Sequence, residues 1–160
     1  MALNHPLFRT LIFILLLIWI AGFSSLPIFP NNVLSAKSFF IIHQMYSNVC
    51  HQLPERSIEF SGWLFLVCAR CTGIYFGAAA ASFFSLIINK RIYISRKLII
   101  IALLPMLVDV ILYQIKVYQY SKTTAFISGI FSGSAVFLYI LFLLENFLDE
   151  LKLKTKHESK

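Results

Sequence analysis

The chain has 160 residues, of which 59% are hydrophobic and 13% are charged. A soluble domain carries about a quarter charged residues, so the composition excludes an ordinary soluble domain and favours a membrane protein in contact with the lipid bilayer. The formal net charge of +7 is distributed between apolar runs rather than along one stripe, which argues against a nucleic-acid partner. The length suits one compact bundle, and we predict a single membrane domain over residues 1–160.

Four long apolar runs are each about the length that crosses a hydrocarbon core. They predict transmembrane helices over residues 10–28, 72–89, 98–115 and 124–146, followed by a solvated tail over residues 147–160. A signal peptide is the alternative for the first run, but that run is long for one and Ala21-Gly22-Phe23 is a poor cleavage site. We expect an all-α integral membrane protein, a bundle of four transmembrane helices.

The distribution of lysine and arginine predicts the orientation of this bundle. The connection over residues 89–97 contains Lys90, Arg91, Arg96 and Lys97, and further basic residues occur at the N-terminus and in the tail. Fewer basic residues flank the other ends of the helices. We therefore predict a multi-pass protein of the cell membrane, with both termini in the cytoplasm and residues 31–71 facing outward.

The outward segment contains two further patterns. Apolar residues at helical spacing predict an amphipathic helix at the membrane interface; they are Leu34, Ile41, Met45 and Val49. Pro54 should end any helix there. Residues 58–67 are apolar and aromatic with a break at Ser61-Gly62, which leaves open an extended segment, a short hairpin or a segment that re-enters the membrane.

Small residues recur every fourth position in two of the predicted helices. The second helix has Gly73, Gly77 and Ala81, and the fourth has Ala125, Gly129 and Gly133. Such faces let helix backbones approach closely in lipid, so we expect the second and fourth helices to pack together. The alternative is that glycine and alanine are simply common in membrane helices.

All three cysteines, Cys50, Cys68 and Cys71, lie within the outward segment, and His51 follows the first of them. Together these four residues make a Cys3His set, which is a common complement for zinc or another transition metal. A structural disulfide, inert thiols and catalytic thiol redox chemistry are the alternatives. A covalently bound c-type haem is disfavoured because Thr72, not histidine, follows the second cysteine of the Cys-x-x-Cys pair.

Charged residues near the cysteines extend the candidate site. Cys71 falls at a predicted helix N-terminus, where the helix dipole favours the thiolate, and Arg70 strengthens that effect. Asp109 lies inside an apolar run, where a carboxylate is costly without a partner, and we predict Arg70 as its first and Arg56 as its second partner. The catalytic candidates are therefore Cys68, Cys71, Arg70 and Asp109.

Several short blocks resemble the domain-of-unknown-function family 2085, a group of small prokaryotic membrane proteins. The blocks are Cys50-His51-Gln52-x-Pro54-x-Arg56-Ser57, Cys68-Ala69-Arg70-Cys71-Thr72-Gly73-Ile74-Tyr75-x-Gly77 and Leu104-Pro105-Met106-x-x-Asp109, with Gln114 further on. The resemblance implies a membrane protein with a shared set of polar residues. It implies no reaction, because no activity is assigned to the family.

The expected function is an outward-facing cysteine, histidine and arginine site that binds a metal or holds a disulfide. One alternative is a membrane thiol–disulfide oxidoreductase, quinone-linked by architectural analogy. Another is a small transporter that uses Asp109. The sequence contains no phosphate-binding loop, nucleophile elbow or paired-carboxylate motif, which argues against hydrolase and nucleotide chemistry.

Overall fold

The computed structural model describes residues 5–28, 36–60, 62–88, 93 and 95–158. Its elements in chain order are α1 (His5–Ile28), α2 (Ala36–Ser47), the 3-10 helix η1 (Pro54–Arg56), β1 (Ser57–Phe60), β2 (Trp63–Cys68), α3 (Ala69–Ile88), α4 (Arg96–Gln114) and α5 (Lys122–Glu158). Four of the described helices, α1, α3, α4 and α5, are long and apolar enough to cross a membrane. The four predicted helices are therefore present, and the two-stranded sheet corrects the all-α class.

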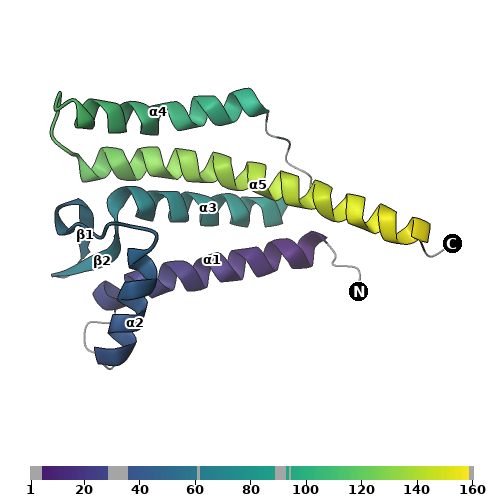
Figure 1. Ribbon diagram of the computed structural model, residues 1–160, viewed down its shortest axis with the longest axis horizontal. Coiled ribbons are helices and arrows are strands. Elements are labelled where there is room, and N and C mark those ends of the chain that lie inside the picture. The colour runs from purple at the N-terminus through teal and green to yellow at the C-terminus, as the bar shows by residue number, and fades with distance from the viewer. Residues whose placement is uncertain (1–4, 29–35, 61, 89–92, 94, 159–160) are drawn as a thin grey trace.

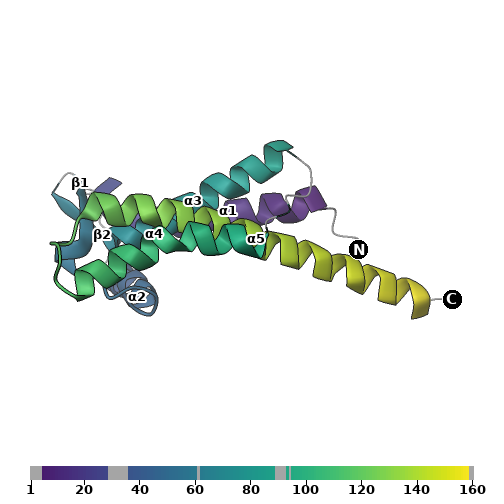
Figure 2. The same cartoon turned by 90° about the horizontal axis from the view of Figure 1, so that it is seen from above.

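The four long helices lie side by side in the order α4, α5, α3, α1 (Figure 1). The hairpin of β1 and β2, together with α2, gathers at the end where α1 finishes and α3 begins. The start of α1 and the end of α5 lie toward the opposite end, and α5 extends well beyond the other helices (Figure 2). The connection between α4 and α5 is at the hairpin end, so residues distant in the sequence meet there.

Two helices extend beyond the predicted transmembrane segments. The helix that contains the second segment begins at Ala69, because β2 continues into α3 without a connecting loop. Helix α5 continues to Glu158, so residues 147–158 are helical, and their place in a solvated tail stays a prediction. Leucine, glutamate and lysine dominate the end of α5, and these straight-chain residues lose little freedom in a helix.

Helices α3 and α5 pack through their small residues, as predicted. A Cβ on Gly77 would lie 2.9 Å from Ile130 Cα, and one on Gly133 would lie 2.7 Å from Ile74 Cα. No side chain fits at such distances, so glycine is required for this approach of the two backbones. Ser134 closes the same contact from α5, since its hydroxyl donates to the Gly77 carbonyl at 3.0 Å.

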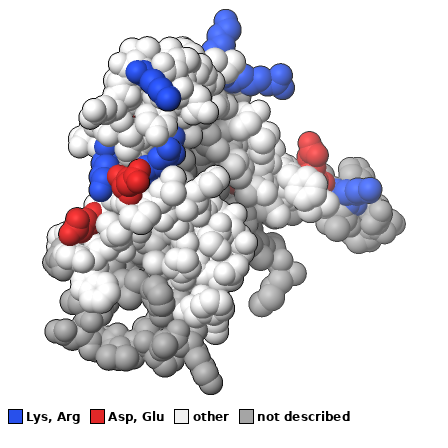
Figure 3. Space-filling model, turned by 60° about the vertical axis from the view of Figure 1, so that its left-hand side comes forward, with Lys and Arg blue, Asp and Glu red and all other residues white. Residues whose placement is uncertain are grey.

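Helix α4 packs at the edge of the bundle. Asp109 is its only buried residue, and the structure describes all of α4. The Ser132 hydroxyl of α5 donates to the Ala102 carbonyl of α4 at 3.2 Å. Much of the described surface is apolar, and charged side chains gather in limited patches (Figure 3). A helix that buries so little apolar surface against protein is suited to lipid, where exposed apolar side chains carry no penalty.

The hairpin decides among the alternatives for residues 58–67. Strands β1 and β2 pair antiparallel, with Ser57 opposite Cys68 and Phe60 opposite Trp63. Gly62 has φ +80°, a conformation that favours glycine in the turn. The hydrophobic core lies at this end of the bundle and draws on α1, α2, β2 and α3; its buried members are Ile20, Phe23, Tyr46, Cys50, Leu66, Val67 and Ala79.

The amphipathic helix is present as α2, but its apolar stripe does not pack on the bundle. Ile41 and Met45 of α2 are exposed, Val49 is exposed in the turn after α2, and Leu34 lies outside the described residues. The buried anchor is Tyr46, whose hydroxyl donates to the Trp19 carbonyl at 2.7 Å. The sequence pattern did not single out this tyrosine, and the interfacial position of α2 stays a prediction.

A buried ion pair lies at the opposite end of the bundle. Arg9 Nε lies 2.6 Å from Glu145 Oε1, and Arg9 Nη1 donates to the Ser85 carbonyl at 2.8 Å. The two side chains are 4% and 2% exposed. The pair joins α1, α3 and α5. Arg9 belongs to the basic N-terminus from which the orientation is predicted, but no sequence pattern indicated its partner. Most of the basic connection over residues 89–97 lies outside the described residues.

Candidate functional site

Three separate elements bring the cysteines together. Cys50 follows α2 in a turn in which its amide donates to the Tyr46 carbonyl at 3.0 Å. Cys68 ends β2, and Cys71 lies in the first turn of α3. The three Sγ atoms all lie within 4.8 Å of one another. The cysteine triad, as we call this set, is therefore a product of the hairpin, which returns Cys68 to the side of Cys50.

Hydrogen bonds within the triad favour a thiolate at Cys50. The Cys68 amide donates to Cys50 Sγ at 3.2 Å. Hydrogen bonding by the Cys68 thiol, and then by the Cys71 thiol, lowers the pKa of Cys50, and burial acts in the opposite direction. All three cysteines are free thiols in the structure. A thiolate is the form of cysteine that attacks disulfides and binds metals.

The fourth predicted ligand does not join the triad. His51 is exposed, and neither of its nitrogens belongs to the group of converging ligand atoms. The backbone explains this separation. Gln52 has φ +50°, and its side-chain amide donates to the His43 carbonyl at 3.2 Å, so the chain turns back toward α2 directly after His51. The structure thus joins three of the four predicted ligands.

Asp109 and Arg70 form the predicted ion pair. Arg70 Nη2 contacts Asp109 Oδ2, and the Tyr118 hydroxyl donates to the other carboxylate oxygen. The side chains of Arg70 and Asp109 are 18% and 3% exposed. Both carboxylate oxygens are therefore engaged, which offsets the cost of burying the charge. Since Arg70 lies between Cys68 and Cys71 in the chain, the pair ties the triad to α4.

Arg56, the second predicted partner of Asp109, instead contacts two tyrosines. Its Nη2 donates to the Tyr113 hydroxyl at 2.9 Å. Its guanidinium lies over two tyrosine rings, 4.9 Å from the centroid of Tyr113 and 5.5 Å from that of Tyr120. Arg70 also lies over Tyr120, at 6.0 Å. The sequence analysis did not single out these tyrosines. Their signal was the recurrence of tyrosine at the end of α4 and in the connection to α5.

Most of the remaining motif residues stabilise the elements that carry the triad, and Gln114 lies apart from it. The Thr72 hydroxyl donates to the Cys68 carbonyl at 3.0 Å, and the Ser57 hydroxyl donates to the Leu53 carbonyl at 3.1 Å. Pro54 opens η1, where proline is tolerated because the first turn needs no amide donor. Gly73 meets α5, Tyr75 packs on Trp19 and Phe23, and Gln114 ends α4 at the surface.

A comparison with known families finds a match over the part of the chain that carries the candidate site. The family model described as "Predicted membrane protein (DUF2085)" matches residues 50–139, more than half of the chain. The chain belongs to this family. The match begins at Cys50 and includes the triad, Arg70, Asp109 and the tyrosines around Arg56. The resemblance drawn from the sequence blocks is therefore confirmed.

Two similar curated proteins are described as uncharacterized. An uncharacterized protein of Methanocaldococcus jannaschii is 38% identical over 103 residues, which are 62% of this chain and 66% of that protein. One from Methanothermobacter thermautotrophicus is 60% identical over 30 residues, 19% of this chain and 27% of that protein. The chain thus spans less than two thirds of the length of either relative. No solved structure matches the chain.

Proposed function

We propose that Cys50, Cys68 and Cys71 together bind one divalent, thiol-preferring metal ion, with zinc the best fit. The observation that supports the proposal is the approach of all three Sγ atoms to within 4.8 Å of one another. Zinc–sulfur bonds of ~2.3 Å in a tetrahedral site place the sulfurs roughly 3.8 Å apart. Small rotations of the cysteine side chains would therefore enclose an ion.

Charge favours a divalent ion over a monovalent one. Three thiolates around a divalent ion leave one net negative charge, whereas a monovalent ion leaves two. Uncompensated charge in a partly buried site is costly. Arg70 supplies a nearby positive charge, since it lies immediately before Cys71, but it is paired with Asp109. A divalent ion leaves the smaller net negative charge and therefore the smaller cost of burial.

A three-cysteine set leaves one coordination position to be filled. A fourth protein ligand would make a closed, structural site, whereas a water molecule would leave a position open to substrate. His51 is the nearest candidate in the chain, and it would have to turn inward from its exposed position. From the charge distribution of the sequence, we propose that the site faces away from the cytoplasm.

Metal analysis of the purified full-length protein tests the proposal. We expect close to one zinc per chain, and loss of zinc from each of the single variants Cys50→Ser, Cys68→Ser and Cys71→Ser. His51→Ala is the matched control: retained zinc indicates an open position, and lost zinc indicates a fourth ligand. A chain that holds no stoichiometric metal, and takes up none when reduced and supplied with zinc, would refute metal binding.

Thiol–disulfide exchange is the second candidate, and one observation favours it. Cys50, whose pKa is lowered, lies next to the Cys68 and Cys71 thiols, so any two of the three could pair. An apolar groove of about 350 Å3 begins beside Tyr75, one helical turn after Cys71, which suits the quinone-linked form of this alternative. Asp109 has both oxygens engaged, so we assign it a positioning role rather than transport.

Thiol counting distinguishes the two candidates. A redox site should lose two free thiols per chain in oxidised glutathione and regain them with dithiothreitol, with or without chelator. A metal site should protect all three thiols from alkylation until a chelator removes the ion. Three thiols that are alkylated at once, with and without chelator, and never pair in oxidised glutathione would count against both functions.

A further inference from the structure

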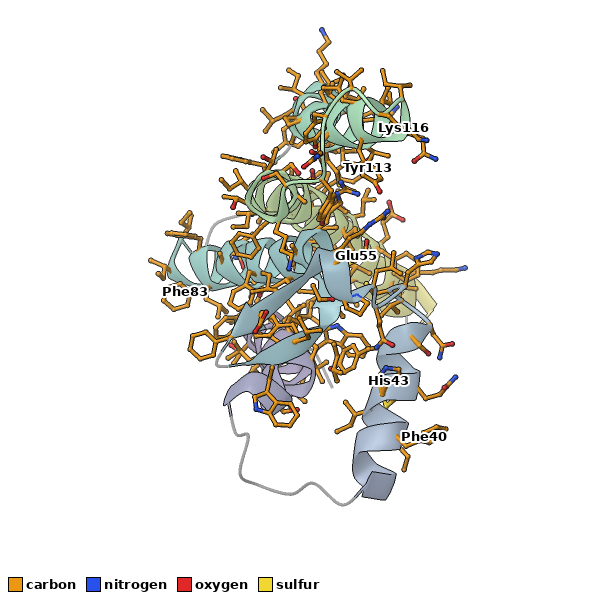
Figure 4. The ribbon with its side chains drawn as sticks, turned by 90° about the vertical axis from the view of Figure 1, so that its left-hand side faces the viewer. Phe40, His43, Glu55, Phe83, Tyr113 and Lys116 are labelled. Atoms are coloured by element: carbon orange, nitrogen blue, oxygen red, sulfur yellow. The ribbon has the colours of Figure 1, made fainter. Side chains whose placement is uncertain are left out.

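A polar pocket of about 710 Å3 lies at the connection between α4 and α5. Its lining supplies hydrogen-bond donors from two cations, tyrosine hydroxyls and side-chain amides, chiefly Arg56, Tyr113, Gln114, Lys116, Gln119 and Tyr120. Among the described residues that line it there is no carboxylate. Figure 4, which looks onto this end of the molecule, shows Tyr113 and Lys116 close together at the end of α4. A pocket with this lining is suited to an anion.

The backbone at Lys116 provides a second, independent observation. Lys116 has φ +58°, the left-handed conformation, directly after the end of α4. Its amide donates to the Tyr113 carbonyl at 3.0 Å, and the Val117 amide donates to the Leu112 carbonyl at 3.1 Å. This is the helix-ending position that glycine or asparagine normally occupies. Lysine is uncommon in this conformation, and such backbone conformations cluster at functional sites.

Arg56 is held in place before any ligand arrives. Its guanidinium is fixed over the rings of Tyr113 and Tyr120, and one of its N–H groups donates to Tyr113. A guanidinium has five donors in a planar fork, which matches the oxygens of a phosphate group. A fixed arginine binds such a group without first losing side-chain freedom.

We infer that this pocket binds the phosphate group of an anionic ligand. The pocket lies between the end of one candidate membrane span, in α4, and the start of the next, in α5. The ends of membrane spans lie at the depth of the lipid phosphates. A lipid headgroup and a soluble phosphate share this chemistry. The inference rests on Arg56 and Lys116 and is independent of what the cysteine triad binds.

Calorimetric titration of the full-length protein in a non-ionic detergent tests the inference. One arm uses inorganic phosphate, and the other uses short-chain dihexanoyl phosphatidylglycerol. We expect Lys116→Asn and Arg56→Gln each to weaken binding about five-fold, the effect of one cation near a phosphate. Lys122→Gln removes a charge at the same end of the bundle but outside the pocket lining, and should leave binding unchanged.

Each outcome decides the matter. Saturable binding of inorganic phosphate supports a soluble ligand, and binding of the lipid alone supports a headgroup site. Asparagine tolerates the left-handed conformation, so Lys116→Asn should fold normally and keeps the test valid if Arg56→Gln does not fold. No saturable binding of either probe, or binding that is unchanged in Lys116→Asn, would overturn the inference.

Discussion

Replacing Gly77 by leucine should weaken the contact between α3 and α5. A Cβ at this position would lie 2.9 Å from Ile130 Cα and 3.0 Å from the Ile130 carbonyl carbon, and closer still to its oxygen. Ordinary contact begins near 3.4 Å, so the two backbones must separate before any larger side chain fits. Overpacking typically destabilises by about 1–3 kcal/mol, while leaving glycine improves helix propensity by under ~1 kcal/mol. The atoms in the way belong to the backbone and cannot move aside alone, so the upper end of that range applies, and we expect a net loss of about 2 kcal/mol.

Unfolding by SDS in mixed micelles, followed by circular dichroism, measures this free energy. Ala80→Leu is the matched control, because Ala80 lies on the exposed side of the same helix, three residues away. The control should stay within about 0.5 kcal/mol of the parent protein, as surface substitutions usually do. Equal free energies of unfolding for Gly77→Leu and Ala80→Leu would mean that α3 and α5 do not pack through this face.

Three further predictions follow from the charged residues and the cysteines. Arg70→Gln and Asp109→Asn should each lower the free energy of unfolding by about 2 kcal/mol, since each leaves a largely buried group without its partner. The double variant should be little less stable than either single variant, and full additivity in the double-mutant cycle would contradict the pairing. Glu145→Gln should destabilise by about 3 kcal/mol because Arg9 stays buried without its carboxylate, and an unchanged SDS midpoint would argue against this tie between α1 and α5. Impermeant maleimide applied to intact cells, after reduction and chelation, should label the triad, whereas protection equal to that of a cytoplasmic control would reverse the predicted orientation.

The long helices and their closest contact could be predicted from local patterns. Apolar runs of bilayer length mark the four helices, and small residues at every fourth position mark the faces that meet. The ends of the helices were less predictable. The start of α3 depends on β2, which pairs with β1 and so holds Cys68 in an extended conformation until Ala69. Sequence alone left residues 58–67 open among an extended segment, a short hairpin and a segment that re-enters the membrane.

The candidate site also has features that the sequence predicted and features that depend on the tertiary fold. The Asp109–Arg70 pair was predictable because a carboxylate within an apolar run needs a partner at a similar depth. The part played by Tyr118 was not, since its hydroxyl reaches Asp109 only because the chain reverses after α4. The exposed position of His51 likewise depends on the left-handed backbone at Gln52. Cys50 and His51 are adjacent in the sequence, but only the Cys50 side chain joins the triad.

The sequence by itself determined the four long helices and the pairing of Asp109 with Arg70, and its short motif blocks indicated the family. The helices follow from composition and periodicity, and the ion pair follows from the energetic cost of charge in an apolar setting, all of which are local properties. Only the tertiary structure decided that three cysteines converge without the histidine, that Arg56 is fixed over two tyrosine rings, and that Arg9 meets Glu145. Those contacts join residues far apart in the chain, and their geometry depends on turns whose backbone conformation the residue pattern does not specify.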